Sequence, residues 1–302
     1  MKSLDRGKLR FKTDDMGTVE IEWEKVEGLS AEERFEVELT NGEKFFGTLE
    51  RSPEPGKVTV VEGDSSQSLD LVAIVRMNQV ERSFWERWSG DASVGFDFAT
   101  ATQITQWSAM GRADYRKENY SAHLDLSSIL TSQANAEKTT RNSIGLQVNR
   151  PLRARWFFTW LGQLEQNEEL GLEFRLLFGV GVGRHLLQTD RTQLALLGAV
   201  GYSREQFQGT DDARNSAESI AGIDYDFFLF DDPEVDVSTQ VYLVPSLTEE
   251  GRVRLEVKSD LRIELFSDFF LGLNLVESYD SRPGEFASKN DFAIFTSLGW
   301  TF

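Results

Sequence analysis

The last twelve residues, Asp291-Phe-Ala-Ile-Phe-Thr-Ser-Leu-Gly-Trp-Thr-Phe302, decide the fold. The even-numbered residues are largely apolar, and the odd-numbered residues between them are small or polar, except Phe295. A period of two predicts a β-strand with two unlike faces. On a soluble sheet edge, the side chains of Leu298, Trp300 and Phe302 would be exposed and would promote aggregation. On a membrane barrel they belong on the lipid-facing side, so the stretch favours a barrel over a soluble β-sandwich.

The chain from Gly90 to Phe302 falls into segments of this kind at a spacing of about 18 residues, which suits a tilted membrane-spanning strand plus its connection. The twelve predicted strands are Gly90–Ala101, Gln103–Tyr115, Tyr120–Leu130, Thr139–Val148, Arg155–Glu165, Leu170–Arg184, Thr192–Arg204, Ser216–Phe228, Glu234–Pro245, Arg252–Leu265, Phe269–Tyr279 and Asp291–Phe302. In Arg252–Leu265 one face is aliphatic and the other is fully ionised. A soluble sandwich also alternates, with its polar face in solvent. Twelve successive segments and an even count favour the barrel.

No run of 18 apolar residues occurs, so a membrane protein with this sequence would have to be a β-barrel. We therefore predict an all-β protein with a 12-stranded antiparallel transmembrane β-barrel over residues 90–302. With both barrel ends on the periplasmic side, the connections from odd to even strands would face outward, and most of them are short.

Composition excludes several classes of function. The formal charge of −18 argues against nucleic acid as a partner, because phosphate binding needs a concentrated basic face. The absence of Cys removes thiolate catalysis and Cys-ligated zinc. The pairs Asp211-Asp212 and Asp231-Asp232 fall far short of a calcium cage. No cofactor and no metal site are predicted. The start lacks a basic stretch followed by an apolar one, so we expect any export signal to have been removed.

Residues 1–82 predict a small, acidic periplasmic β domain. Short alternations cover Lys8–Thr13, Thr18–Trp23, Phe35–Thr40, Lys44–Glu50, Lys57–Val61 and Ser68–Leu71, and Asn41-Gly42 is a strong hairpin signal. The pattern that begins at Gly7 recurs at Gly56, and only the second copy follows a hairpin, so the chain is expected to begin partway into a repeat. Residues 83–89 form an aromatic linker, for which we expect anchoring at the membrane interface or the barrel rim.

Several motifs occur together in one order along most of the chain. They are Asp14-x-x-Gly17-x-Val19-x-Ile21-x-Trp23, the Asn41-Gly42 hairpin, Gly179-x-Gly181-x-Gly183-Arg184, Tyr279-Asp-Ser-Arg-Pro283 and Leu298-Gly-Trp-Thr-Phe302. In this combination the sequence resembles the salt-induced outer-membrane protein family of Gram-negative bacteria, a family of unknown function. The resemblance implies a periplasmic domain attached to an outer-membrane β-barrel, and it supplies no catalytic or binding residues.

The C-terminal end also resembles the signature by which outer-membrane barrels are recognised for assembly. Leu298, Trp300 and Phe302 are the residues that carry this signal. The partners expected for the barrel are therefore outer-membrane lipid and the barrel-assembly machinery.

Strand phase assigns twelve acidic and six basic side chains to the lumen, and most of them are candidate pore residues. The candidates are Asp97, Arg112, Asp114, Asp125, Arg141, Glu173, Arg175, Asp224, Arg254, Glu256, Lys258, Asp260, Arg262 and Glu264, and Glu165, Glu218, Asp226 and Asp291 complete the inward set. In an open lumen this acidic excess would favour cations over anions. The alternative is that most of these charges pair across strands and fill the interior.

Two other classes of function remain open. An outer-membrane hydrolase could use His123 with Asp125, Ser121 and Ser127 on one inward face, but no nucleophile motif accompanies them, so we predict a protein that is not an enzyme. His185 is expected to be solvated at a periplasmic turn. A binding role would make the barrel an anchor and the N-terminal domain the working part. Its Glu20, Glu22, Glu36 and Glu38 would then suit a basic periplasmic protein partner.

Overall fold

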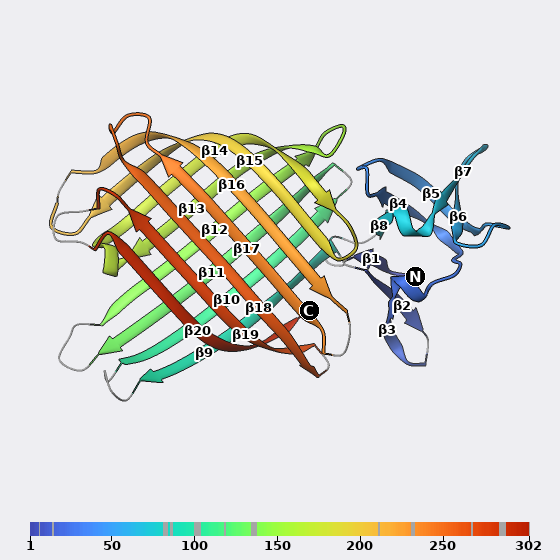
Figure 1. Cartoon of the computed structure of the whole chain (residues 1–302), viewed down its shortest axis with the longest axis horizontal. Coiled ribbons are helices and arrows are strands. Elements are labelled where there is room, and N and C mark those ends of the chain that lie inside the picture. Colours follow the sequence, from blue (N-terminus) through green and yellow to red (C-terminus); the bar gives the residue numbers. More distant parts are fainter. Residues whose placement is uncertain are drawn as a thin grey trace.

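The structure, a computed structural model, consists of two β-sheet units (Figure 1). It describes residues 1–5, 7–13, 15–80, 84, 87–99, 104–117, 119–133, 138–210, 212–230, 233–266, 268–283 and 288–301. Within these residues no helix has the length and apolar character needed to cross a membrane. The helical elements are the short 3-10 turns η1 (Trp23–Lys25), η2 (Leu71–Ala73) and η4 (Glu168–Leu170).

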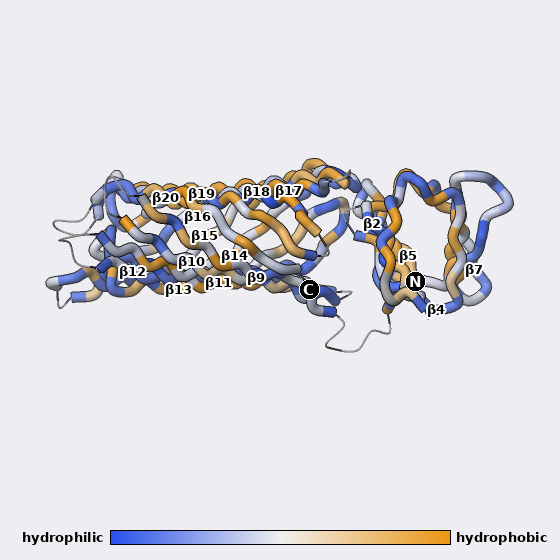
Figure 2. The backbone as a smooth tube through the Cα atoms, turned by 90° about the horizontal axis from the view of Figure 1, so that it is seen from below, coloured by the Kyte–Doolittle hydropathy of each residue, from blue (hydrophilic) through white to orange (hydrophobic). Residues whose placement is uncertain are grey.

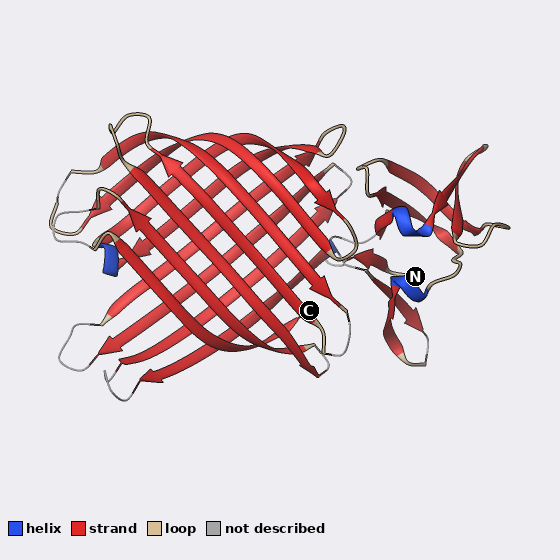
Figure 3. Ribbon diagram, in the orientation of Figure 1, coloured by secondary structure: helices blue, strands red, loops and turns tan. Residues whose placement is uncertain are grey.

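The larger unit is a closed barrel of twelve antiparallel strands (Figure 3). Its strands are β9 (Trp88–Ala99), β10 (Ile104–Lys117), β11 (Tyr120–Gln133), β12 (Thr139–Pro151), β13 (Trp156–Asn167), β14 (Leu172–Gln188), β15 (Thr192–Phe207), β16 (Arg214–Leu229), β17 (Val235–Pro245), β18 (Val253–Phe266), β19 (Phe269–Asp280) and β20 (Asn290–Thr301). Each strand pairs with the next, and β20 pairs with β9 to close the cylinder. The predicted fold class is confirmed, strand by strand.

Hydrophobic and hydrophilic residues alternate along the barrel strands (Figure 2), and many of the large apolar side chains are exposed on the outside of the barrel. On β20, for example, Ile294, Leu298 and Trp300 remain about half exposed, while Ser297 between them is buried. A soluble sandwich would instead bury the aliphatic rows against each other. The closed ring of strands leaves no second sheet for that packing.

Two positions in the barrel depart from strict alternation of apolar and polar side chains. Phe295, the exception in the C-terminal pattern, points into the lumen and packs with Ile129 and Val276. At Glu173 a β-bulge interrupts the register between β14 and β15, so Glu173 and Phe174 are both exposed. Glu173 therefore does not share the buried interior with Arg175. The inward assignment of Glu173 was wrong, because a bulge shifts side-chain phase by one residue.

The N-terminal unit is an eight-stranded sheet in the order β3-β2-β1-β8-β4-β5-β6-β7. Its strands are β1 (Ser3–Asp5), β2 (Lys8–Thr13), β3 (Gly17–Glu22), β4 (Ala31–Leu39), β5 (Lys44–Arg51), β6 (Lys57–Glu62), β7 (Ser65–Asp70) and β8 (Ile74–Gln79). If β1–β4 are matched with β5–β8, the order reads the same from both edges of the sheet. The repeat seen in the sequence therefore corresponds to two halves related by a pseudo-twofold axis. The last strand of each half, β4 or β8, pairs with the first strand of the other half.

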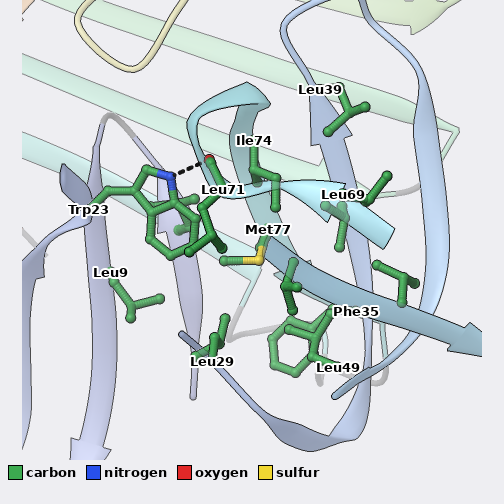
Figure 4. Packing of buried hydrophobic residues seen from close by; sticks show 14 residues of the cluster. Leu9, Trp23, Leu29, Phe35, Leu39, Leu49, Leu69, Leu71, Ile74 and Met77 are labelled. Carbon is green, nitrogen blue, oxygen red and sulfur yellow. Dashed lines mark hydrogen bonds between the residues drawn. The ribbon is translucent and has the colours of Figure 1, made fainter. Parts of the chain in front are cut away.

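Equivalent hydrogen bonds support this duplication. The Trp23 N–H donates to the Gly7 carbonyl oxygen at 2.7 Å, and the Leu71 N–H donates to the Gly56 carbonyl oxygen at 2.9 Å. Both glycines have positive φ, 67° and 77°, which glycine adopts without strain. The Trp23 indole N–H also donates to the Leu71 carbonyl, which joins the two halves at the apolar core (Figure 4).

Some boundaries differ from the predicted ones. The short strands β1 and β8 were not predicted, and β9 begins at Trp88, inside the predicted linker. The Asn41-Gly42 hairpin joins β4 to β5, with positive φ at Gly42 only. Several residues of the predictions lie outside the described residues: Asp14, Arg82, Ser83, Trp85, Glu86, Asp211, Asp231, Asp232 and Phe302.

Candidate luminal site

The N-terminal unit lies against one end of the barrel, which we call the domain end (Figure 1). Gln188 on β14 donates to Glu38 Oε1 at 2.8 Å, and Arg116 on β10 contacts Asp5 at 3.3 Å. Three further contacts lie around them: Lys8 pairs with Glu234, Arg191 Nη2 lies 2.6 Å from Glu24, and Gly42 lies against Arg155. The contacts are mainly polar and ionic, and the polar face of the sheet is turned toward the barrel.

The glutamates predicted to form a face for a basic partner make ion pairs within the chain. Glu36 pairs with Lys44, and Glu38 contacts Arg76 Nη1 at 3.1 Å as well as Gln188 of the barrel. Glu20 pairs with Lys8 and Arg10. The carboxylates thus meet bases of their own chain, and Glu38 meets the barrel itself.

Burial would oppose ionisation of Glu38, but the charges of Arg76 and Lys44 and the Gln188 hydrogen bond outweigh that effect. The pKa of Glu38 is therefore lowered from its ordinary value.

At the opposite end of the barrel, the far end, charged side chains meet inside the lumen. We call Glu165, Arg175, Glu205, Glu218, Arg252, Arg254 and Asp280 the closing cluster. Arg175 contacts Glu165 at 2.9 Å and Glu205 at 2.6 Å, along the cross-strand row of β13, β14 and β15. Arg252 contacts Glu205 at 2.7 Å and Asp280 at 2.6 Å, and Arg254 contacts Glu218 at 2.5 Å.

The closing cluster spans the lumen rather than following its wall. Glu205 lies on β15 and Arg252 directly precedes β18, with β16 and β17 between these strands in the barrel. Their side chains keep 0% and 1% of their exposed area. A second link lies beside them, because Arg141 on β12 reaches Asp291 on β20 at 2.8 Å, where Asn167 also donates. Ion pairs therefore bridge the far end of the lumen.

The inward row of β18 joins this strand to several others across the interior. Arg262 contacts Asp91 on β9 at 2.8 Å, and Asp260 contacts Arg112 on β10 at 2.9 Å. Gln163 on β13 donates to Glu256 at 3.2 Å. Lys258, in the middle of the row, forms no direct ion pair with any residue that the structure describes, although the charges of Asp125 and Glu256 act on it.

The remaining predicted residues lie at different depths: Asp97 is two residues from the far end of β9, and Asp224 and Glu264 lie closer to the domain end. Asp97 accepts from Thr296 at 3.1 Å, and Asp224 accepts from the Tyr242 hydroxyl at 3.0 Å. The Glu264 backbone N–H donates to the Glu234 carbonyl oxygen at 2.9 Å. Leu298 and Trp300 of the predicted assembly signal face outward.

His123 does not form the arrangement that a hydrolase would need. Its Nδ1 lies 2.9 Å from Asp114, and its Nε2 lies 3.0 Å from Asp125. With both ring nitrogens directed at carboxylates, neither is free to accept a proton from Ser121 or Ser127. His185 was predicted to be solvated, yet it is only partly exposed. Its ring lies tilted against Phe157, with the ring centroids 5.0 Å apart, and its Nδ1 is buried.

Four ion-pairing residues were missed: Asp91, Glu205, Arg252 and Asp280. Glu205 and Asp280 fell just beyond the predicted strand ends, whereas β15 and β19 run on through them. Asp91 and Arg252 lay inside predicted strands and have the inward phase, so continuing the alternation to the segment ends would have found all four.

The lumen between the two ends contains two adjoining cavities, of about 740 and 810 Å³. They share Asp125, Ser143, Gln163, Glu256 and Lys258 as lining residues. On the β13–β17 side the smaller cavity is bounded by Leu161, Leu177, Ile220 and Val244, which belong to an apolar cluster inside the barrel. This wall is unusual, because the interior of an outer-membrane barrel is generally polar.

Residues 92–302 match a family described as "Protein of unknown function, DUF481". No curated protein sequence matches the chain. Among solved structures, the NanC porin covers 70% of this chain and 98% of its own at 12% identity and a TM-score of 0.43. The translocator domain of the autotransporter NalP from Neisseria meningitidis covers 70% and 86% at 10% identity and 0.37. The β domain of the Bordetella autotransporter BrkA covers 71% and 97% at 10% identity and 0.35. At these identities the likeness concerns the barrel fold alone.

Proposed function

We propose that this protein, which belongs to the DUF481 family, is an outer-membrane β-barrel with a cation-preferring lumen. In this proposal the closing cluster holds the far end of the lumen shut. The observation that carries it is the cross-lumen contact of Glu205 on β15 with Arg252 just before β18, two almost completely buried charges from strands that are not neighbours in the barrel.

The location rests on the outer surface of the barrel. Every strand of the barrel has large aliphatic or aromatic side chains that are exposed, which suits contact with acyl chains. The connections at the domain end are short, and short turns face the periplasm in barrels of this type. The N-terminal unit is therefore assigned to the periplasmic side. The C-terminal strand, with Leu298 and Trp300 outward, is the segment that the assembly machinery would bind.

The cation preference rests on the inward charges between the two ends. Eight carboxylates face three permanent bases there, an excess of five negative charges: Asp91, Asp97, Asp114, Asp125, Asp224, Asp226, Glu256 and Asp260 against Arg112, Lys258 and Arg262. His123, if it carries a proton between its two carboxylates, reduces the excess to four. Fixed negative charge in a narrow passage raises the local concentration of cations.

The test removes one acid and one base of the closing cluster together, so that no charge is left unpaired. In planar bilayers the Glu205→Ser/Arg252→Ser double variant is expected to conduct at least tenfold more than the wild type. The matched control is Glu173→Ser at the same end of the barrel, outside the lumen, which should leave conductance at the wild-type level. A correctly folded double variant that conducts no better than the wild type would overturn the proposal.

A further inference from the structure

The charged row of β18 contains one lysine whose surroundings differ from those of its neighbours. Arg254, Asp260 and Arg262 each have an oppositely charged partner across the lumen. Lys258 forms no direct ion pair among the described residues, although the charges of Asp125 and Glu256 act on it from a greater distance and it lines both luminal cavities. In a lumen where bases are otherwise paired, Lys258 is positioned to receive an anionic group from a ligand.

Glu256, two residues earlier on the same face, offers the opposite charge. Its carboxylate accepts from the Gln163 amide at 3.2 Å, and its nearest base, Arg254 Nη1, is 3.9 Å away. Side chains two residues apart on a strand are separated by about 7 Å at their Cα atoms. Lys258 and Glu256 therefore present a positive and a negative group side by side to the same cavity.

Another wall of that cavity is aliphatic. It consists of Leu161, Leu177, Ile220 and Val244 from β13, β14, β16 and β17, and β17 is the direct neighbour of β18 in the barrel. The empty space between these side chains is about 740 Å³ including the open solvent beside it, so it admits a small molecule and not a large one. A ligand that fits must therefore be small, carry both charges close together and present an apolar group on its other side.

We propose that the lumen binds a zwitterionic solute of the aliphatic α-amino acid class. Its carboxylate meets the Lys258 ammonium, its ammonium meets Glu256, and its side chain lies against the aliphatic wall. This inference rests on the proposed function, because it names a solute for the same lumen. Such a solute should bind more tightly than glycine because its apolar side chain is buried. It should bind more tightly than simple amines or acids because both of its charges are paired.

Isothermal titration calorimetry of the purified full chain in detergent tests the site without any conductance. Four probes are compared: L-leucine, 3-methylbutylamine, which lacks the carboxylate, 4-methylpentanoate, which lacks the ammonium, and glycine, which lacks the side chain. Leucine is expected to bind at least tenfold more tightly than each of the other three. Equal affinity for leucine and glycine, or no heat with leucine at millimolar concentration, would overturn the site.

Variants locate the site within the lumen. Lys258→Met and Glu256→Gln should each weaken leucine binding at least tenfold, while Glu173→Gln, outside the lumen, should leave it unchanged. Unchanged leucine affinity in Lys258→Met would also refute the assignment. Folding of each variant is checked by heat-dependent migration on gels, and the four-probe comparison on the wild type needs no variant. Leucine binding without cation conductance would support this site and reject the proposed channel. Cation conductance without leucine binding would support the channel and reject this site.

Discussion

Glu205 illustrates, at the scale of the residue, how a polar interior holds its shape. Its carboxylate is fully buried and contacts both Arg175 and Arg252 within 2.7 Å. A buried charge is costly when it lies alone, and much less so when partners satisfy it. The far end of the lumen therefore depends on the set of charges more than on any single pair.

Glu205→Gln leaves two buried guanidinium groups with one carboxylate fewer, so we expect the free energy of unfolding to fall by about 3–5 kcal/mol. Glu205→Gln/Arg252→Gln removes one charge of each sign, and its loss should be clearly smaller than the sum of the two single losses. Urea unfolding of the reconstituted protein, followed by tryptophan fluorescence, measures all three. Additive single losses would contradict the coupling.

Glu38 gives a prediction for pH. Its pKa in the folded protein lies below the ordinary value of 4.5, so its ionised form stabilises the fold above about pH 4.5. That stabilisation is lost as the pH falls through the lowered pKa. The protection of the β4 amides, which is their intrinsic exchange rate divided by the observed rate, should therefore fall between about pH 5 and pH 3. In Glu38→Gln this extra pH dependence should disappear, and a Gln variant with an unchanged profile would contradict the assignment.

At the scale of the element, the strands of the barrel could be predicted because each carries its own signal. The period of two on β18 or β20 is visible in a few residues and needs no knowledge of neighbours. Strand ends and the bulge at Glu173 were harder, because they depend on hydrogen bonding to the adjacent strand. The short β1 and β8 were missed for a related reason: each is defined by pairing with a segment far away in sequence.

Val200 tests the outward face of one element. It lies in the middle of β15, is 57% exposed and pairs with Val180 on the neighbouring strand. If this face meets acyl chains, Val200→Arg should cost about 2–4 kcal/mol of folding free energy in bilayers. Val200→Leu is the control and should cost much less. Refolding titrations into lipid vesicles measure both, and equal tolerance of Arg and Leu would exclude a lipid-facing position.

At the scale of the whole molecule, the sequence predicted an acidic interior and left open whether paired charges fill it, but it did not identify which pairs meet across the lumen. Cross-lumen pairs such as Arg141–Asp291 join residues 150 apart in sequence, and only the closed ring brings them together. The aliphatic wall inside the lumen was also not predicted. Leu177 and Ile220 are apolar residues at inward positions, and the sequence alone does not show that they meet in one cluster. The N-terminal unit was predicted as a separate domain, whereas its contact with the domain end depends on the folded shapes of both units.

The central claim is that a net negative lumen lies behind the closing cluster. The most direct measurement is the reversal potential of the Glu205→Ser/Arg252→Ser variant in a planar bilayer under a potassium chloride gradient. The account predicts a potential displaced toward the equilibrium potential of potassium. A reversal potential displaced toward that of chloride would contradict it.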